Sequence, residues 1–420
     1  MRKLAVFRVM LILFLVATLL LVSIVKAGSW SSPSYITDPS FCDIGISGCP
    51  SISGDGGKIA FTTGMMDNEA EIFVINSDGT GLTQLTTNTE FNNAKHFGEP
   101  SINYDGGKIA FQYDNGNGGE IYVIDSDGTG LKQLTDFKTR PGCSEPSISG
   151  DGSKIAFRLV DFNTWNRGIF VINSDGTGLK QLTESDYFDE QPSICYDGSK
   201  IAFLGADDFD FQYFVINSDG TGLTQLTQNT NKYQDVNNPS SLPPSGPSIS
   251  ADGSKVAFEG YVGEDTEIFV VNSDGTGLRQ LTDNAENDWA PDISGDGRRI
   301  VFQRTPRQQE GIAGMQLFVI NCDGTELTQL SDDSERQFSF PSISDDGEKI
   351  AFWNSFWSGD PESSVDFEAE TIISLVSYLS ESENGNDAEA TFPLAMVVGS
   401  ILPIAVSVML AAYLKKRKPW

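Results

Sequence analysis

Short apolar runs alternate with polar turns along most of the chain, and this pattern predicts β-strands. In the run EIFVI at 71–75, both alternate sets of positions are apolar, Ile72 with Val74 and Phe73 with Ile75. A strand with one face in water alternates apolar and polar residues instead. Both faces of this strand are therefore predicted to be buried, as in a sheet packed between two neighbouring sheets.

The strands belong to a repeat that occurs seven times. Its first half is PSISGDGGKIAF at 50–61, and its second half is EIFVINSDGTGLTQLT at 71–86. Copies of the first half begin 44 to 55 residues apart, a period typical of a four-stranded propeller blade. They begin at Pro50, Pro100, Pro146, Pro192, Pro247, Pro291 and Pro341.

Each copy is predicted to form four antiparallel strands joined by turns that contain glycine. In the first copy the strands are PSIS at 50–53, KIAF at 58–61, EIFVI at 71–75 and LTQLT at 82–86. Asp-Gly pairs lie between the first two strands and between the last two. Such pairs favour the left-handed backbone of a tight hairpin turn.

The two ends of the repeat array predict how the ring closes. The seventh copy has a third strand at 370–379, ETIISLVSYL, but no evident fourth, and a spare strand, SYITD at 34–38, precedes the first copy. Pairing of the spare strand with the last copy would remove open sheet edges. The sequence thus predicts an all-β fold, a β-propeller of seven four-stranded blades over 31–379, closed by an N-terminal strand. Six blades with leftover strands is the alternative.

The repeats resemble those of the TolB-type β-propeller family, a relative in shape of the WD-repeat propellers. The matching letters are PSIS.DG.KIAF and EIFVINSDGTGL.QLT, and the resemblance covers residues 34–380. It implies a propeller fold for nearly the whole region between the two ends of the chain. It implies little about function, because such propellers serve many roles.

The two ends of the chain carry membrane-related signals. A basic start and the apolar run at 9–25 predict a secretory signal peptide over 1–27, with an uncleaved signal anchor as the alternative. The uncharged segment 392–414 predicts one transmembrane helix, and the basic tail 415–420 favours the cytoplasmic side. We therefore expect a single-pass protein of the cell membrane, with an extracytoplasmic propeller, an acidic linker at 380–391 and a cytoplasmic C-terminus.

The region between these ends is strongly acidic. It carries 20 basic residues and all 58 acidic residues of a chain whose formal net charge is −30. Such a surface repels phosphate backbones, so we expect no nucleic-acid partner. Divalent cations or cationic partners fit the charge, and the simpler interpretation is that the charge keeps an exposed surface soluble.

Residue types for common catalytic and metal sites are scarce. The single histidine, His96, cannot be paired with a nucleophile by spacing, and a His-rich metal site is excluded by the count. The oxygen-rich turn NSDGTG is compatible with calcium, but Asp-Gly is also the expected chemistry of a tight turn. We expect no catalytic residues, no metal site and no cofactor, with calcium as the alternative.

Five cysteines lie in the region that we expect outside the cytoplasm, where disulfides persist. Cys42 and Cys49 are close enough in sequence to form a disulfide, and the odd total leaves at least one cysteine unpaired within a monomer. The chain contains no CxxC motif, which gives no support to a redox or zinc site.

Binding residues are expected on the loops where the copies differ. In a propeller, the loops between the second and third strands and between blades share one rim, and binding residues tend to lie on such loops. Aromatic residues beside carboxylates suit a carbohydrate or a cationic peptide; the alternative is that these aromatics pack the rim and channel. The candidates for a binding rim are His96, Trp165, Tyr187, Trp289, Trp353 and Trp357.

Together these observations favour a non-enzymatic, membrane-anchored module that binds or scaffolds an envelope or extracellular protein or a glycan. One alternative is an extracytoplasmic hydrolase or lyase that uses carboxylates, and another is a structural component of the cell envelope. A carboxylate pair about 5–10 Å apart in a deep pocket, the range of glycosidase acid/base pairs, would favour the enzyme.

Overall fold

The structure of the protein is a computed structural model that describes residues 29–37, 49–63, 70–87, 96–114, 118–137, 141–161, 167–184, 188–207, 210–227, 244–263, 265–305, 314–333, 336–358 and 368–379. All regular elements in these ranges are β-strands. No helix among them is long and apolar enough to cross a membrane. The predicted signal peptide, acidic linker, transmembrane helix and basic tail lie outside the described residues.

The strands follow the repeat in chain order, after two N-terminal strands, β1 (Ser29–Trp30) and β2 (Ser34–Tyr35). The first copy contains β3 (Ser51–Ile52), β4 (Lys58–Thr63), β5 (Glu71–Asn76) and β6 (Thr83–Gln84). The second contains β7 (His96–Phe97), β8 (Ser101–Ile102), β9 (Lys108–Asp114), β10 (Gly119–Asp125) and β11 (Lys132–Gln133). The third contains β12 (Pro141–Ile148), β13 (Lys154–Asp161), β14 (Arg167–Asn173) and β15 (Lys180–Gln181).

The later copies keep this order of strands. The fourth contains β16 (Phe188–Ile194), β17 (Lys200–Asp207), β18 (Asp210–Asn217) and β19 (Thr224–Gln225). The fifth contains β20 (Ser248–Ile249), β21 (Lys255–Val262), β22 (Asp265–Asn272) and β23 (Arg279–Gln280). The sixth contains β24 (Asn287–Ile293), β25 (Arg299–Thr305), β26 (Gln316–Asn321) and β27 (Thr328–Gln329). The seventh contains β28 (Arg336–Ile343), β29 (Lys349–Ser358) and β30 (Glu368–Leu379).

Hydrogen bonds join the described strands into six sheets, which corrects the prediction of seven separate four-stranded blades. Four sheets have four strands, one has five and one has nine. The nine-stranded sheet holds the second and third copies, which are joined by one parallel residue pair between β10 and β12, Gly119 with Gly142. A Cβ on Gly119 would lie 2.4 Å from the carbonyl oxygen of Cys143. Because glycine has no side chain, the two copies approach closely enough to fuse at this point.

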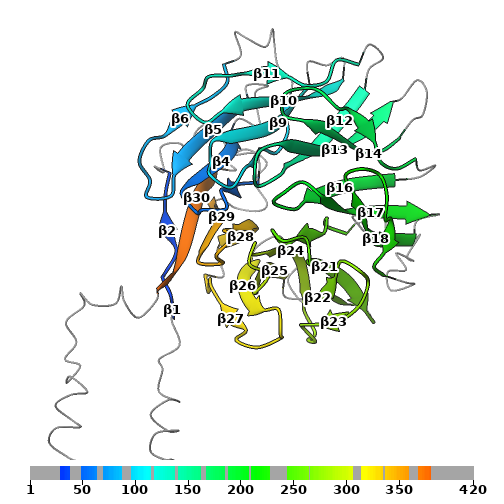
Figure 1. Cartoon of the computed structure of the whole chain (residues 1–420). Coiled ribbons are helices and arrows are strands. Elements are labelled where there is room, and N and C mark those ends of the chain that lie inside the picture. The colour runs from blue at the N-terminus through cyan, green and yellow to red at the C-terminus, as the bar shows by residue number, and fades with distance from the viewer. Residues whose placement is uncertain are drawn as a thin grey trace, which may run out of the picture. The chain divides into compact units, whose positions relative to one another are not determined.

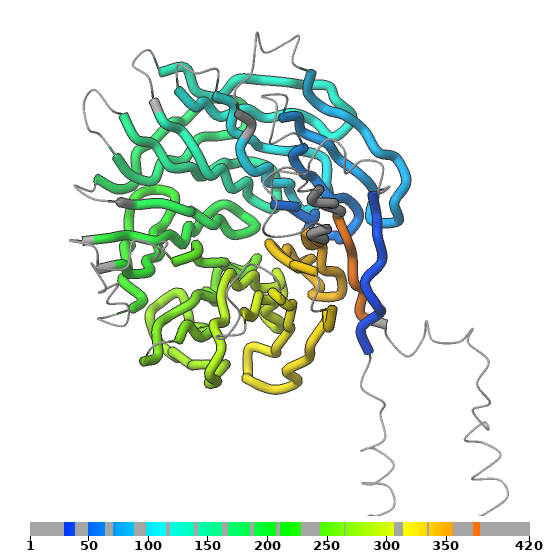
Figure 2. Tube along the Cα trace, turned by 180° about the vertical axis from the view of Figure 1, so that it is seen from behind, coloured from blue at the N-terminus to red at the C-terminus, as the bar shows by residue number. Residues whose placement is uncertain are grey.

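The sheets stand around a central axis, so the compact unit Trp30–Tyr378 is a β-propeller (Figure 1). The view from behind shows the same ring, with the blue N-terminal strands beside the orange β30 (Figure 2). This arrangement confirms the predicted all-β propeller. It also places the first strand of each copy nearest the axis, where a channel runs through the ring.

The N-terminal strands close the ring, as the sequence predicts. Both β1 and β2 pair with β30, the third strand of the seventh copy. The backbone N–H of Ser31 donates to the carbonyl of Ser377 at 2.8 Å, and that of Ile36 donates to Ile373 at 2.9 Å. The Ile36 side chain joins a core cluster that includes Ile373. The predicted third strand at 370–379 is also confirmed, because β30 spans it.

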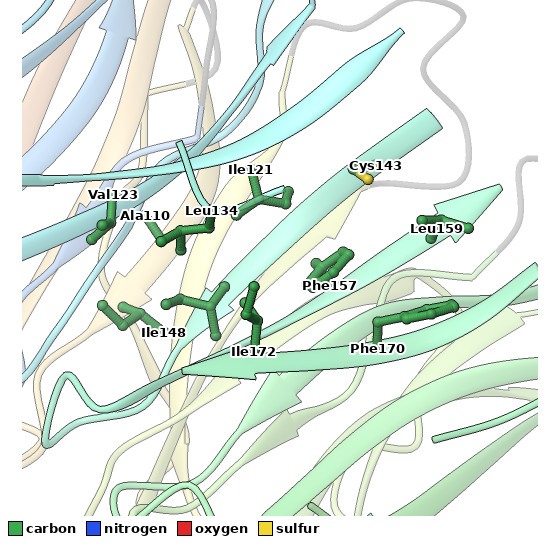
Figure 3. Close-up of a cluster of buried hydrophobic side chains, with 11 residues drawn as sticks. Ala110, Ile121, Val123, Leu134, Cys143, Ile148, Phe157, Leu159, Phe170 and Ile172 are labelled. Carbon is green, nitrogen blue, oxygen red and sulfur yellow. The ribbon is translucent and has the colours of Figure 1, made fainter. Parts of the chain in front are cut away.

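Apolar side chains fill the space between neighbouring sheets. Figure 3 shows one such cluster, in which Val123 and Leu134 of the second copy pack with Ile148 and Ile172 of the third. The first five side chains of β5 are buried, which confirms the prediction that both faces of this strand are covered. Full burial of one large apolar side chain contributes about 1.5–3 kcal/mol. These interfaces between sheets therefore supply most of the apolar stabilisation of the ring.

Backbone hydrogen bonds around the axis join each copy to the next. The residues involved are the Asp of the first Asp-Gly turn and the residue before it. For example, the N–H of Asp345 in the last copy donates to the carbonyl of Gly54 in the first at 2.9 Å. In the described residues the donor–acceptor pairs are Asp55–Tyr104, Tyr104–Gly150, Asp151–Tyr196, Tyr196–Ala251, Ala251–Gly295, Asp296–Asp345 and Asp345–Gly54. All seven copies are therefore linked in one continuous circle.

Two local predictions need correction. The first turn is longer than a tight hairpin turn: the N–H of Ser53 donates to the carbonyl of Lys58 at 2.8 Å, which leaves four residues between them, and Gly56 has a φ of 67°. The fourth strand is shorter than LTQLT, because β6 contains two residues. The hydroxyl of Thr86 accepts the hydrogen bond of the Ile72 N–H at 2.9 Å. This side-chain bond replaces the next backbone bond and ends the strand.

Candidate functional site at the channel mouth

The first strands of the seven copies surround a cavity of about 640 Å³ on the ring axis. This volume lies within the range of small-molecule sites, about 300–1,000 Å³. Each copy contributes the proline of its PSI motif and the next residue, which is Asp292 in the sixth copy and serine elsewhere. We call this part of the channel the channel mouth. The residues that precede the prolines also line it: Cys49, Glu99, Glu145, Gln191, Gly246, Ala290 and Phe340.

The other end of the channel is narrower, with a cavity of about 160 Å³. The rings of Tyr104 and Tyr196 meet there edge to face, with their centroids 5.4 Å apart. The Asp345 side chain fits against Gly54 and Gly295, where an added Cβ would lie 2.9 and 2.2 Å from its Cγ. A ligand on the axis therefore has more room at the channel mouth than at this narrow end.

In four copies, the residue before the proline of the PSI motif lies in a β-bulge with a left-handed backbone. Glu145, Gln191, Ala290 and Phe340 have φ values of 56°, 53°, 51° and 51°. The strand register shifts at the same points, so each is a β-bulge. A left-handed backbone costs a non-glycine residue about 1–2 kcal/mol, and bulges re-aim side chains beside functional sites. Strain repeated at the wall of one cavity marks the channel mouth as the candidate functional site.

Acidic and basic side chains meet at one side of the channel mouth. Arg158 on β13 lies 3.6 Å from a carboxylate oxygen of Glu145 and 3.6 Å from one of Glu190. The N–H of Gln191 donates to the Glu145 carboxylate at 2.5 Å. Burial raises the pKa of the Glu145 carboxyl and that of Glu190, while Arg158 opposes both shifts. Two carboxyl groups with raised pKa values thus share one guanidinium.

A third carboxyl group, that of Glu259, lies behind the wall of the channel mouth. Glu259 is buried, and its oxygens accept hydrogen bonds from the Ser245 N–H at 3.1 Å and the Ala290 N–H at 2.8 Å. The Ser245 hydroxyl also donates to it. Burial raises the pKa of Glu259. This carboxyl group fixes the backbone of the bulge at Ala290, so its role is to hold the wall in place.

Asp292 takes the place of a serine in the wall. In the other copies the serine hydroxyl accepts a hydrogen bond from a backbone N–H of the following copy, as Ser51 does from Ile102 at 3.3 Å. Asp292 accepts from the Ile343 N–H at 2.9 Å and from the Ser248 hydroxyl at 2.6 Å. Burial raises its pKa. The substitution keeps the link between copies and adds an acidic group to the channel.

Several buried polar atoms around the channel mouth have no hydrogen-bond partner among the described residues. Ser144 Oγ and Gln191 Oε1 belong to side chains that line the cavity. Both amide atoms of Gln303 are unpaired as well, and this residue lies opposite Trp289 in the strand register. Buried polar groups normally have a partner. Ser144 and Gln191 therefore have unpaired atoms just beneath the surface of the cavity, whereas the buried Gln303 does not line it.

The structure brings one of the six predicted rim residues into the channel mouth. Trp289 lines the cavity, and its Nε1–H donates to the Thr305 hydroxyl at 3.0 Å. Trp353 is half-buried and packs beside Phe340, with ring centroids 5.8 Å apart. The backbones of His96 and Trp357 lie in β7 and β29, but their side chains are outside the described part of the chain, as are Trp165 and Tyr187 altogether. A binding role for these residues stays a prediction.

Sequence reasoning did not identify the main residues of the channel mouth. Glu145, Gln191 and Glu259 occupy positions just before the proline or just after KIAF (KVAF in the fifth copy), at the edges of otherwise uniform motifs. These two positions differ from copy to copy, as do the loop residues beyond them, whereas the letters PSI and KIAF are nearly constant. The available signal was this variation at the points where the motifs meet the loops.

The predicted disulfide is not tested by the structure. Cys42 lies outside the described residues. The Cys49 thiol donates to a carboxylate oxygen of Glu99 at 2.9 Å, and burial raises the pKa of this thiol. A pairing of Cys42 with Cys49 therefore stays a prediction.

The aspartate of the NSDGTG turn has a structural role. The N–H and the hydroxyl of Thr80 donate to Asp78 Oδ1 at 2.9 and 2.6 Å, and these hydrogen bonds lower the pKa of Asp78. Within the described residues, no three His, Cys, Asp or Glu side chains gather in a way that could hold a metal ion. The turn thus uses its carboxylate to fix its own backbone.

Comparisons with known proteins support the propeller fold and its resemblance to the TolB family. Residues 41–240 match the family model described as the TolB beta propeller domain. A comparison with curated proteins gave no match. Among solved structures, oligogalacturonate lyase from Vibrio parahaemolyticus is 14% identical and has a TM-score of 0.56, covering 84% of this chain and 98% of that one.

Two further solved structures also match most of this chain and nearly all of their own length. The β-propeller domain of the Trilobed protease from Pyrococcus furiosus is 16% identical with a TM-score of 0.53, covering 77% of this chain and 96% of that one. A putative TolB from Agrobacterium tumefaciens is 18% identical with a TM-score of 0.47, covering 71% of this chain and 94% of that one. At 16% identity the likeness to the Pyrococcus domain supports the fold alone. The Pyrococcus domain is described as having an open velcro topology, whereas here β1 and β2 pair with β30.

Proposed function

Because the chain carries a β-propeller of the TolB family, we propose that it is a non-catalytic binding module whose ligand enters the channel mouth. The observation that carries this proposal is the set of four left-handed bulges at Glu145, Gln191, Ala290 and Phe340. Backbone strain persists where function requires it. In this ring the strain recurs around one cavity of ligand size.

The proposed ligand is a protein segment or a glycan of the envelope or the extracellular space. Unpaired donors and acceptors at the channel mouth suit a ligand rich in hydroxyl or amide groups. The indole of Trp289 offers an apolar face of the kind that packs against sugar rings. The carboxylates of Glu99 and Glu145 add negative charge, which suits a ligand with cationic groups.

We propose that the nine-stranded sheet acts as two blades, so that the ring presents seven first strands to the ligand. Its two halves share one residue pair, Gly119 with Gly142. The two halves separately provide Pro100 and Pro146 to the channel mouth. This count of seven agrees with the seven copies of the repeat.

We further propose that the propeller lies outside the cytoplasm and is anchored in the cell membrane. The support is the apolar run at 9–25 and the uncharged segment 392–414 followed by KKRK. Protease treatment of intact cells tests this placement. Digestion of the propeller is expected, and its protection in intact cells together with digestion after lysis would contradict the proposal.

The binding proposal is tested with the full chain on a glycan array and in pull-downs from envelope extracts. Glu145→Gln, which removes one charge at the channel mouth, is expected to weaken capture of the main ligand about 10-fold. The matched control is Glu348→Gln, which removes the same charge from an exposed position on an Asp-Gly turn and is expected to leave capture unchanged. Equal capture by the wild type and both variants would contradict the proposal.

A second candidate function is a carboxylate-based hydrolase or lyase. The observation that favours it is the pair Glu145 and Glu190, whose pKa values are raised by burial. General acid–base catalysis uses carboxyl groups tuned in this way. Incubation of the full chain with the captured ligand distinguishes the two functions. Cleavage that is lost in both Glu145→Gln and Glu190→Gln would replace the binding proposal, and an intact ligand would retain it.

A further inference from the structure

A groove of about 540 Å³ lies between the fifth and sixth copies, away from the channel mouth. Four of its lining residues are cations: Lys255, Arg279, Arg298 and Arg299. The region between the two ends of the chain contains 20 basic residues against 58 acidic ones. This groove is therefore locally rich in positive charge, although the region as a whole is strongly acidic.

The residues at the equivalent positions of the other copies can be compared with those of this groove. At the position of Arg279 the other copies have threonine or lysine, and at the position of Arg298 they have glycine, serine or glutamate. No other pair of neighbouring copies places cations at all four equivalent positions. The turns that form this rim are otherwise nearly identical in sequence. The difference at this groove therefore does not follow from the needs of the fold.

Three of these cations form no direct ion pair among the described residues, although Arg279 is near enough to the Asp323 carboxylate to help lower its pKa. Lys255 donates to the carbonyl of Gly297 at 2.7 Å, and Arg279 donates to that of Asp323 at 2.6 Å. Arg298 is exposed and lies 3.7 Å from a carboxylate oxygen of Asp296. A guanidinium forms its strongest hydrogen bonds with oxyanions, often two at once.

Arg299 is held in place by its surroundings. It donates to the Gly347 carbonyl at 2.8 Å, and its guanidinium lies 4.0 Å from the centroid of the Tyr378 ring and 5.6 Å from that of Trp30. Neither aromatic ring neutralises the charge. The groove thus combines a half-buried, fixed Arg299 with the exposed cations Arg279 and Arg298.

The rim of the groove departs from the repeat in its backbone as well. Glu326 replaces the second glycine of NSDGTG and keeps the left-handed backbone of that position, with a φ of 56°. Such a conformation costs a non-glycine residue about 1–2 kcal/mol. Cys322 replaces the serine of the same turn. Both residues line the groove, so the departures in sequence converge on one place.

We propose that this groove is a second binding site, which takes a small ligand carrying two or more oxyanion groups, such as phosphates or carboxylates. Arg279 and Arg298 bind the ligand as exposed guanidinium groups, and Lys255 and Arg299 supply further positive charge. Asp323 and Glu326 are the two exposed carboxylates of the groove lining, and both oppose anion binding. Asp323 keeps its negative charge, because the hydrogen bonds from Thr325 to its Oδ1 lower its pKa, but the four cations of the lining outnumber the two carboxylates.

The test uses substitutions that replace residues of the groove by those found at the equivalent positions of other copies. Arg279→Thr with Arg298→Ser gives this groove the residues found at the equivalent positions of the fourth and fifth copies, Thr224 and Ser254. The matched control is Lys180→Thr, because Lys180 donates to the Asp219 carbonyl as Arg279 does to that of Asp323. Glu326→Gly restores the glycine of the other turns.

Titration calorimetry of the full chain with pyrophosphate, citrate and uncharged sucrose measures binding at low and high salt. We expect at least one anion to bind, with affinity reduced about 10-fold or more in the double variant and unchanged in Lys180→Thr. Glu326→Gly is expected to tighten binding several-fold, because it removes a repelling charge. The stronger of the two anions identifies phosphate or carboxylate as the preferred group.

Two results would overturn the proposal. One is the absence of binding heat with both anions at low salt, and the other is an equal loss of affinity in the double variant and in Lys180→Thr. If the double variant does not fold, the single variant Arg298→Ser takes its place, since this side chain is 83% exposed. In that case a loss of less than 2-fold would count against the proposal.

Discussion

The two ends of the central channel are built from the same seven first strands but in opposite ways. At the narrow end, backbone hydrogen bonds between the first turns join consecutive copies, and the lining side chains are either very small or those of Tyr104, Tyr196 and Asp345. At the channel mouth the copies differ from one another, and four of them adopt a left-handed bulge. One end of each strand therefore builds the ring, and the other end forms the cavity.

This comparison shows how a repeat protein separates folding from function. Where copies carry the same letter, that letter makes the same contact with the next copy, as the serines of the PSI motif do when they accept a backbone hydrogen bond from it. At the edges of the constant motifs, where the residues vary, the contact is local to one copy. Variation at the edges of the motifs therefore points to a candidate site, and the four experiments below probe the closure of the ring and the two ends of the channel, from the largest expected effect to the smallest.

The largest effect is expected from opening the ring. Deletion of residues 31–37 removes β2, one of the two N-terminal strands that pair with β30, together with the buried side chain of Ile36 and the backbone bonds to Ser377 and Ile373. The combined loss of one buried apolar side chain and several hydrogen bonds is about 5 kcal/mol in the free energy of unfolding. Urea denaturation measures it. An unchanged midpoint would show that the ring does not depend on this closure.

The second experiment breaks the narrow end. In Gly150→Ala the added Cβ would lie 2.3 Å from Cδ2 of Tyr196 and 3.1 Å from its Cα. Overpacking of this kind costs about 2 kcal/mol, measurable as a lower urea midpoint. Ala251 occupies the same position in the fifth copy, so Ala251→Gly serves as the control and should cost less than 1 kcal/mol. Equal losses in the two variants would mean that the narrow end is not tightly packed.

The third experiment uses pH at the narrow end. Burial and the nearby carboxylates of Asp292, Asp346, Asp296 and Asp55 raise the pKa of Asp345 to about 6. The folded protein therefore holds this proton more tightly than the unfolded chain, in which an aspartate has a pKa of about 3.9. Stability from this group is present below pH 4 and is lost as the pH rises through 6.

The expected loss is about 1 kcal/mol once solvent screening of this partly exposed side chain is included. Asp345→Asn should remove that part of the pH dependence when unfolding is measured between pH 4 and pH 7. Asp332→Asn, at an exposed position, serves as the control and should leave it in place. An identical pH profile for the wild type and Asp345→Asn would contradict the assignment.

The smallest effect is expected at the channel mouth and has the opposite sign. Ala290 has a φ of 51°, so Ala290→Gly relieves left-handed strain but also adds freedom to the unfolded chain. The net result is a gain of about 0.5 kcal/mol. The same change at Ala251, where φ is not positive, should destabilise the protein. Destabilisation by Ala290→Gly would show that the bulge carries little strain.

The fold could be predicted because its signals are local and repeated. The alternate apolar positions of EIFVI indicate a strand covered on both faces, and the spare strand before Pro50 has a partner in 370–379. The fusion of two copies could not be predicted, because it depends on the spatial meeting of Gly119 and Gly142. The fourth strand is short because the Ile72 N–H donates to a side-chain hydroxyl rather than to a backbone carbonyl. The sequence LTQLT does not indicate which of these acceptors is used.

The candidate site could be predicted much less well. Aromatic residues on long loops directed attention to the rim, and of these Trp289 lines the channel mouth. Glu145 and Gln191 reach the cavity because a bulge turns them there, and glutamate or glutamine before proline does not ordinarily indicate a left-handed backbone. Likewise the burial that raises the pKa of Glu190 arises from the packing of copies side by side, which no single copy encodes.

The closure between β1, β2 and β30 also dictates when the protein can become complete during its synthesis. The hydrogen bond from the Ser377 N–H to the Ser31 hydroxyl joins residues 346 positions apart. The early strand leaves the ribosome long before its partner has been translated, so the ring is sealed in one late step. Until then the nascent chain has an unpaired strand edge, and a prematurely terminated chain would keep that edge open to pairing with other chains.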